Sequence, residues 1–219
     1  MISKFSKTLD YINNMNCGVV SIIGTGKTFK SGTLYTLLDA GYSPRLSARP
    51  KAFYKFPDVS IFPDSLLAYS VEDLDDVESG SILIIEDANR VYPSRSTRSS
   101  DLQEYLGISS HKDVLIFITV QSTANTDQCF FRDQDSVLLF KHVCVSNIAF
   151  ERPEIAQFCN VANIKITKAS NCLAVNPLYV TYCPRFDDTF VMDKPPFWYG
   201  REHSHALANY KIHSSKVVS

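Results

Sequence analysis

Four short apolar runs recur along the chain, separated by longer polar or mixed segments. The runs are GVVSII (18–23), SILIIE (81–86), VLIFITV (114–120) and SVLLFKHVCV (136–145). They are rich in β-branched residues and mostly lack apolar–polar alternation, which is typical of strands buried on both faces of a parallel sheet. The order of strand and helix segments therefore predicts an α/β fold, a mainly parallel sheet with helices on both faces.

Three segments between or after these runs have the pattern of helices. In the segment 31–41 the residues Leu34, Leu37 and Leu38 share one face, and Gly41 supplies a stop signal. The segments 99–110 and 152–162 are the other two predicted helices, and Pro153 near the start of the last one is compatible with a first helical turn.

The composition of the chain changes after about residue 165. The stretch 171–200 is rich in Pro, Tyr and Phe, and we expect one or two edge strands followed by an extended tail lying on the domain. We accordingly divide the chain into a main domain over residues 1–165 and, over residues 166–219, the edge strands and tail of the same domain.

Overall composition excludes several classes of protein. A chain of 219 residues with 45% hydrophobic residues suits a single globular domain, and its net charge of −1 gives no global attraction for nucleic acid. No apolar run approaches the ~20 residues needed to span a bilayer, so we expect a soluble, intracellular protein or one carried inside a particle. The six cysteines are scattered and predict reduced thiols rather than a zinc site or a disulfide framework.

The segment that follows the first apolar run has the outline of a phosphate-binding loop with two candidate lysines. Such a loop follows the pattern G-x-x-x-x-G-K-[ST], whose lysine reaches the β- and γ-phosphates and whose hydroxyl binds Mg²⁺. If Lys27 is the phosphate lysine, the leading glycine is replaced by Ser21. If it is Lys30, Gly24 leads the loop and the only departure is Phe29 in place of the second glycine.

Strand length favours the second alternative, because it leaves GVVSII (18–23) as an intact strand of ordinary length. Ser31 then supplies the hydroxyl for Mg²⁺ and opens the helix, and Lys27 is an additional cation. The predicted phosphate-binding residues are Gly24, Thr25, Gly26, Lys27, Thr28, Phe29, Lys30, Ser31 and Gly32.

Two further polar positions follow apolar runs, at the strand ends where open α/β sheets bind ligands. Glu86 and Asp87 end one run, and Gln121 ends another. We predict that Glu86 binds Mg²⁺ together with Ser31, that Asp87 acts as the catalytic base, and that Gln121 contacts the γ-phosphate and the attacking water.

With these motifs in this order, the chain resembles the FtsK–HerA superfamily of P-loop ATPases between about Val19 and Arg152. It is most similar to the small genome-packaging ATPases of membrane-containing viruses with double-jelly-roll capsids. The likeness is carried by Gly24 to Ser31, by ILIIEDANRVYPSR (82–95), by HKDVLIFITVQ (111–121) and by FERPEI (150–155).

This resemblance implies an enzyme that hydrolyses ATP with Mg²⁺ and drives double-stranded DNA into a preformed capsid. It also implies self-assembly into a ring, contact with capsid-vertex or membrane proteins of the virion, and a location in the host cytoplasm or the virion. In such rings a neighbouring subunit can supply an arginine to the nucleotide. Arg90, Arg95 and Arg98 are candidates, with Arg98 taken as the catalytic one, although each also suits a solvated helix entry.

Two departures from the family pattern, Phe29 and the order Glu86-Asp87, put the rate of hydrolysis in doubt more than nucleotide binding. The alternatives are a filamentous-phage-type morphogenesis ATPase, a small P-loop kinase, or a degenerate nucleotide-binding subunit. The segment 44–56, which mixes four cations with three aromatic residues, is either a DNA-facing patch or an amphipathic edge strand.

Overall fold

A computed structural model describes residues 6–94, 99–132 and 136–209. Within these ranges eight strands form one sheet in the order β3-β2-β4-β5-β1-β6-β7-β8. Strands β1 to β6 are mutually parallel, and β7 and β8 add an antiparallel edge. The strands are β1 (Gly18–Ile23), β2 (Lys51–Tyr54), β3 (Ala68–Val71), β4 (Ile82–Ile85), β5 (Leu115–Val120), β6 (Val137–Phe140), β7 (Val180–Cys183) and β8 (Asp188–Val191).

Strand β1 lies near the middle of the sheet, and every one of its residues is buried. Val19 and Ile23 face one hydrophobic core, whereas Val20 and Ile22 face the other. This two-sided burial is the reason why its sequence is apolar without alternation. The four predicted strands are all present, although β6 ends at Phe140 and the end of its predicted range enters a helix.

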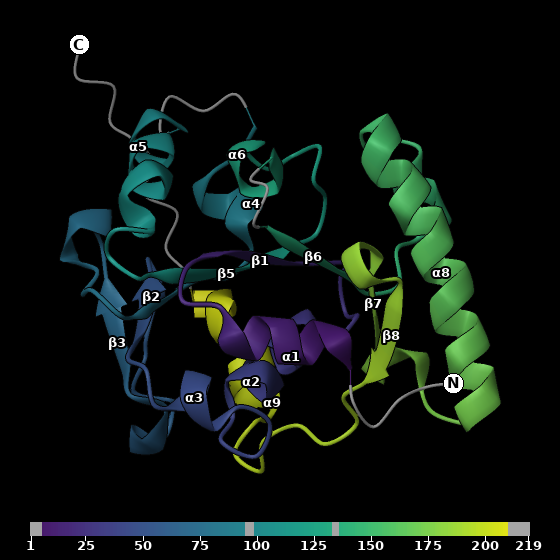
Figure 1. Ribbon diagram of the computed structural model, residues 1–219, viewed down its shortest axis with the longest axis horizontal. Helices are drawn as coiled ribbons and strands as arrows, with labels where there is room; N and C mark the ends of the chain where they lie inside the picture. The colour runs from purple at the N-terminus through teal and green to yellow at the C-terminus, as the bar shows by residue number, and fades with distance from the viewer. Residues whose placement is uncertain (1–5, 95–98, 133–135, 210–219) are drawn as a thin grey trace.

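Helices cover both faces of the sheet (Figure 1), as the sequence predicted. One face carries α1 (Lys7–Asn14), α2 (Lys30–Leu38), α3 (Pro44–Ser47) and α9 (Arg201–Ser204), and the other carries α4 (Ala88–Val91), α5 (Ser99–Ser109) and α6 (Cys129–Arg132). The remaining helices are α7 (Val145–Ile148) and α8 (Pro153–Leu173), and α8 packs against β7. None of the helices in the described residues is long and apolar enough to cross a membrane.

Helix α8 is longer than the segment 152–162 predicted for it. It continues to Leu173 because Ile155, Cys159, Ala162, Ile166 and Ala169 recur at helical spacing and are all buried. The boundary drawn at residue 165 therefore falls inside a helix. Beyond it the sequence predicts one or two edge strands; β7 and β8 lie there and extend the same sheet, with β8 at its edge.

The segment 44–56 is not the amphipathic edge strand that is one of its two expected structures, and most of the residues of the alternative, a DNA-facing patch, are buried or half-buried. Strand β2 pairs with both β3 and β4, so it is not an edge strand. Lys51 is fully buried, and Arg49 donates hydrogen bonds to the carbonyls of Gly80, Ser81 and Asp113. Arg49 and Lys51 thus donate hydrogen bonds to backbone carbonyls within the domain. The aromatic residues of the segment belong to the two hydrophobic cores. The rings and Lys51 are therefore buried away from any DNA-facing surface, and of the four cations Arg45 is exposed and Arg49 and Lys55 are half-buried.

After β8 the chain runs back to helix α2, which contacts α9. We call residues 192–206 the C-terminal segment; within it Trp198 and Tyr199 pack against the hydrophobic core that contains α2. The tail predicted here lies on the domain over this segment, but Arg201–Ser204 form helix α9 and are not extended.

Candidate nucleotide site

The loop between β1 and α2 lies at the carboxyl end of the central strand. β1 ends at Ile23, and α2 begins at Lys30. A Cβ atom at Gly24 would lie 2.7 Å from both Lys141 Cβ and Thr28 Oγ1, so this position needs glycine for close approach. Thr28 Oγ1 in turn donates to the carbonyl of Thr25 at 2.7 Å, which closes the loop on itself.

The two candidate lysines differ in burial. Lys27 is exposed at the tip of the loop, whereas Lys30 is only 7% exposed and its Nζ donates to the Thr25 carbonyl at 3.0 Å. Burial lowers the pKa of Lys30, and the carboxylates of Asp87 and Glu86 act in the opposite direction. Thr33 donates the first backbone hydrogen bond of α2 to Phe29, so the N–H groups before it point out of the helix N-terminus, where anions bind.

Phe29 is accommodated by turning its ring away from the loop. Its φ of 64° is in the left-handed region that favours glycine. The ring lies on Gly32, where an added Cβ would come within 2.3 Å of it, and it makes edge contacts with Tyr179 and Tyr199 at centroid distances of 5.2 and 5.7 Å. The concave side of the loop therefore stays free of the ring.

Glu86 is the buried carboxylate of the site, with 5% exposure at the end of β4. Ser31 Oγ donates to its Oε2 at 2.8 Å, and the Tyr35 hydroxyl donates to its Oε1. Desolvation raises the pKa of Glu86 to about 7 in the absence of a cation, even though the two hydroxyl donors and Lys30 favour the ionised form.

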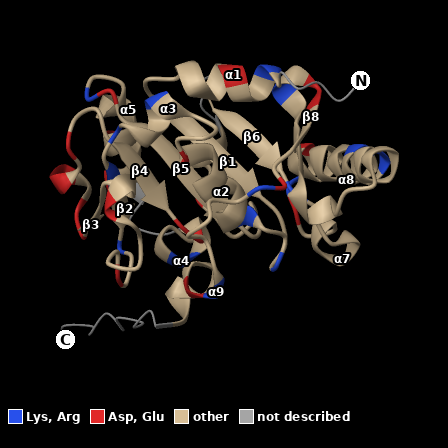
Figure 2. Ribbon diagram, turned by 90° about the horizontal axis from the view of Figure 1, so that it is seen from below, with Lys and Arg blue, Asp and Glu red and all other residues tan. Residues whose placement is uncertain are grey.

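Asp87 follows Glu86 in the left-handed conformation, with a φ of 47°, and its backbone N–H donates to Thr119 Oγ1 at 2.8 Å. Gln121 Nε2 donates to Asp87 Oδ1 at 3.2 Å. The ends of β1, β4 and β5 thus bring Lys30, Glu86, Asp87 and Gln121 to one edge of the sheet. Figure 2 shows basic and acidic residues close together around the start of α2 and the end of β4.

The candidate arginines are placed only in part. Arg90 lies in α4, and its Nη2 donates to the Lys55 carbonyl at 3.2 Å. Arg95 and Arg98 lie outside the described residues.

The donor set fits Mg²⁺. Ser31 and Glu86 offer adjacent oxygen atoms, and Mg²⁺ commonly takes one or two protein oxygens and fills its remaining positions with phosphate and water. Among the described residues no three His, Cys, Asp or Glu side chains gather closely enough to hold a metal ion by themselves. A Mg²⁺ ion held by Ser31 and Glu86 would have positions left for phosphate and water oxygens.

Several residues that shape the site had no signal in the sequence. In the sequence Tyr35 is indistinguishable from the apolar residues of its helix, and Thr119 lies inside an apolar run that predicts a buried strand. Lys141 is fully buried beside Gly24, its Nζ donates to Thr181 Oγ1 at 3.1 Å, and desolvation lowers its pKa to about 7. Glu151 accepts from the N–H groups of Thr123 and Ala124 and fixes the loop after Gln121.

Comparison with known proteins gives structural neighbours only. No family model matches the sequence, and no curated protein matches it significantly. The genome packaging NTPase B204 from Sulfolobus turreted icosahedral virus 2, in complex with AMP, superposes with a TM-score of 0.52 at 12% identity, covering 83% of this chain and 98% of B204. Its AMPPCP complex gives a TM-score of 0.51 at 12% identity, covering 83% of this chain and 99% of that one.

The DNA-packaging ATPase B204 from Sulfolobus Turreted Icosahedral Virus superposes with a TM-score of 0.52 at 14% identity, covering 83% of this chain and 100% of B204. These matches span nearly the whole length of the neighbours. The chain therefore shares the α/β fold of these neighbours, and the fold implied by the resemblance of its motifs is confirmed.

Proposed function

We propose that this protein is a viral genome-packaging ATPase that couples hydrolysis of ATP to translocation of double-stranded DNA into a preformed capsid. The observation that carries the proposal is the convergence of Lys30, Ser31, Glu86 and Asp87 at the carboxyl edge of the sheet. The shared fold with the B204 packaging NTPases, one of them in complex with AMPPCP, supports the same function.

In this proposal the helix N-terminus and Lys30 bind the β- and γ-phosphates, and Lys27 adds positive charge from the exposed side. Ser31 and Glu86 hold Mg²⁺, which would neutralise phosphate charge and favour the ionised form of Glu86. Gly24 to Gly32 surround the phosphates.

Asp87 is the base for the attacking water. Two hydrogen bonds position it: its backbone N–H donates to Thr119 Oγ1, and its carboxylate accepts from Gln121 Nε2. Gln121 can exchange its bond with Asp87 for one with a γ-phosphate oxygen, which suits a residue that senses the nucleotide. The proposed arginine finger is Arg98 of a neighbouring subunit in a ring, with Arg90 and Arg95 as the other candidates.

The proposal is tested by measuring ATP hydrolysis with Mg²⁺, with and without linear double-stranded DNA, in a matched pair of variants. We expect DNA to stimulate the wild type, Lys30→Ala to abolish hydrolysis, and Lys27→Ala only to weaken it, because only Lys30 is buried beside the carboxylates. Asp87→Asn should retain nucleotide binding and lose turnover.

Each result has a distinct meaning. Hydrolysis that is lost in Lys27→Ala and kept in Lys30→Ala would assign the loop to the other register. Hydrolysis insensitive to DNA would contradict the packaging motor and leave a nucleotide hydrolase of another kind. Loss of nucleotide binding in Asp87→Asn would show that Asp87 serves the metal.

A further inference from the structure

The buried carboxylate of Glu86 is held by two hydroxyl groups from one helix. Ser31 and Tyr35 are four positions apart, so they lie on the same face of α2, and each donates to a different carboxylate oxygen. A buried charge is tolerated only when it is hydrogen-bonded or paired. The pair of hydroxyls therefore accounts for both oxygens of Glu86.

The two donors are not equivalent once a cation is bound. In the proposed function the Ser31 oxygen binds Mg²⁺ through a lone pair while its hydrogen donates to Glu86, so this hydroxyl is shared between the cation and the carboxylate. The Tyr35 hydroxyl donates to the other carboxylate oxygen and serves Glu86 alone. Tyr35 is thus the donor whose part in this pair is only to orient Glu86.

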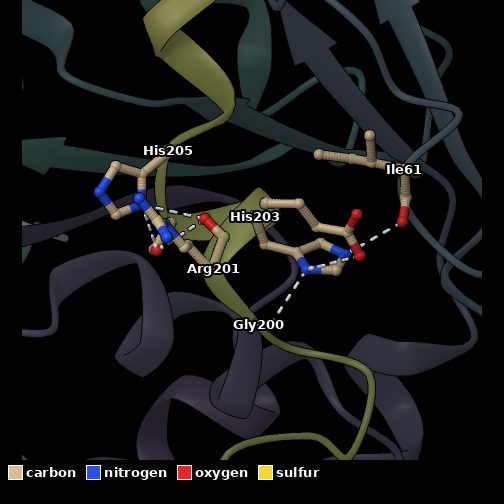
Figure 3. A network of polar contacts seen from close by, with 7 residues as sticks. Ile61, Gly200, Arg201, His203 and His205 are labelled. Atoms are coloured by element: carbon tan, nitrogen blue, oxygen red, sulfur yellow. Dashed lines mark hydrogen bonds and ion pairs between the residues drawn. The ribbon is translucent and has the colours of Figure 1, made fainter.

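The ring of Tyr35 is fixed from several sides. Its centroid lies 5.2 Å from Phe62, 5.7 Å from Trp198 and 5.7 Å from Tyr199, and the side chain is fully buried. Trp198 and Tyr199 belong to the C-terminal segment, in which His203 accepts from the Gly200 N–H and bonds to the Ile61 carbonyl outside the segment (Figure 3). A ring enclosed in this way holds its hydroxyl at one place.

We propose that Tyr35 is a positioning residue for Glu86: its hydroxyl, held by the aromatic cluster with the C-terminal segment, orients the carboxylate for the Mg²⁺–nucleotide complex. The proposal rests on the proposed function and deepens it. It assigns the C-terminal segment a part in the nucleotide site, although no residue of that segment belongs to the loop or to the strand ends.

The test is Tyr35→Phe, which keeps the ring and removes only the hydroxyl. Binding of AMPPCP is measured by calorimetry with and without Mg²⁺. In the wild type Mg²⁺ should tighten binding, and in Tyr35→Phe this tightening should fall about 10-fold, as for other groups that orient metal ligands. Affinity without Mg²⁺ should stay unchanged, because the loop and Lys30 are untouched.

Tyr105→Phe is the matched control. Tyr105 is also a buried tyrosine, and its hydroxyl has no hydrogen-bond partner among the described residues. It lies in α5 on the opposite face of the sheet, so Tyr105→Phe should bind AMPPCP like the wild type at every Mg²⁺ concentration. Thermal unfolding of all three proteins, followed by circular dichroism, separates a binding effect from a loss of fold.

A Tyr35→Phe protein whose Mg²⁺ dependence equals that of the wild type would overturn the proposal and reduce Tyr35 to a core residue. An equal weakening of AMPPCP binding with and without Mg²⁺ would overturn it too, since it indicates a general distortion of the loop. A different result would contradict the proposed function itself: wild-type protein that binds AMPPCP with the same affinity whether Mg²⁺ is present or absent.

Discussion

Phe29 stands at a backbone position that glycine usually occupies in a phosphate-binding loop. The left-handed conformation costs a residue with a side chain about 1 kcal/mol. Two edge-on aromatic contacts, with Tyr179 and Tyr199, contribute a comparable amount each and offset that cost. The Phe29 ring can take this place only because Gly32 has no side chain to meet it. The loop therefore tolerates phenylalanine at position 29 but requires glycine at position 32.

This dependence predicts a strong coupling between positions 29 and 32. Gly32→Ala alone should destabilise the protein by about 1–3 kcal/mol, because its methyl group meets the Phe29 ring. In a Phe29→Gly background the same alanine should be neutral or stabilising, since alanine favours a helix by about 1 kcal/mol over glycine. Urea unfolding of the wild type, both single variants and the double variant gives the coupling energy. Additive effects would show that the ring does not lie on Gly32.

At the scale of elements, the buried side chain of His203 links the C-terminal segment to the domain by a hydrogen bond, in addition to the packing of Trp198 and Tyr199. The carbonyl of Ile61 can only accept, so His203 Nε2 carries the proton and donates to it at 3.0 Å, while Nδ1 accepts from the Gly200 N–H at 3.1 Å. The ring also packs on Trp198 and Phe62. His205 lies on the other side of Arg201 and is exposed (Figure 3).

The two histidines therefore make a matched pair for testing this attachment. His203→Ala should lower the free energy of unfolding by about 2–4 kcal/mol, because a buried, packed ring is removed and the Gly200 N–H and the Ile61 carbonyl lose their partner. His205→Ala should change it by less than about 0.5 kcal/mol. Urea unfolding measures both, and similar losses in the two variants would argue against a specific role for His203.

At the scale of the whole molecule, the buried amine of Lys141 sets a pH dependence of stability. Its pKa falls from 10.5 in the unfolded chain to about 7 in the fold, so folding favours the neutral amine. The corresponding stability is present above about pH 10.5 and is lost as the pH falls toward 7.

Lys141→Met removes this titration and keeps a long side chain against Gly24. Its stability relative to the wild type should increase by a few kcal/mol as the pH falls from about 10 to about 7, superimposed on a constant loss of about 1 kcal/mol for the bond to Thr181. Thermal unfolding of both proteins across that range measures the difference. A pH-independent difference would mean that the folded protein keeps the amine charged.

The sheet could be predicted from the sequence because its central strands are buried on both faces, and such strands need uninterrupted apolar runs. The bounds of β1 agree with the prediction residue by residue, and it is this strand that distinguishes the two lysine registers. The segment 44–56 could not be predicted in the same way. Lys51 bonds to the backbone carbonyl of Ser47, and Arg49 to those of Gly80, Ser81 and Asp113; composition alone does not reveal such partners.

The sequence by itself determined the α/β class, the position of the loop from Gly24 to Phe29 between a strand and a helix, and the strand ends that carry Glu86, Asp87 and Gln121. These features follow from local periodicity and from the chain order of strands and turns. Only the tertiary structure decided that Phe29 turns onto Gly32, that Tyr35 reaches Glu86, and that the C-terminal segment encloses the Tyr35 ring. The first depends on the left-handed backbone of Phe29, and the other two depend on contacts between residues from different elements; none of these leaves a periodic signal in the chain.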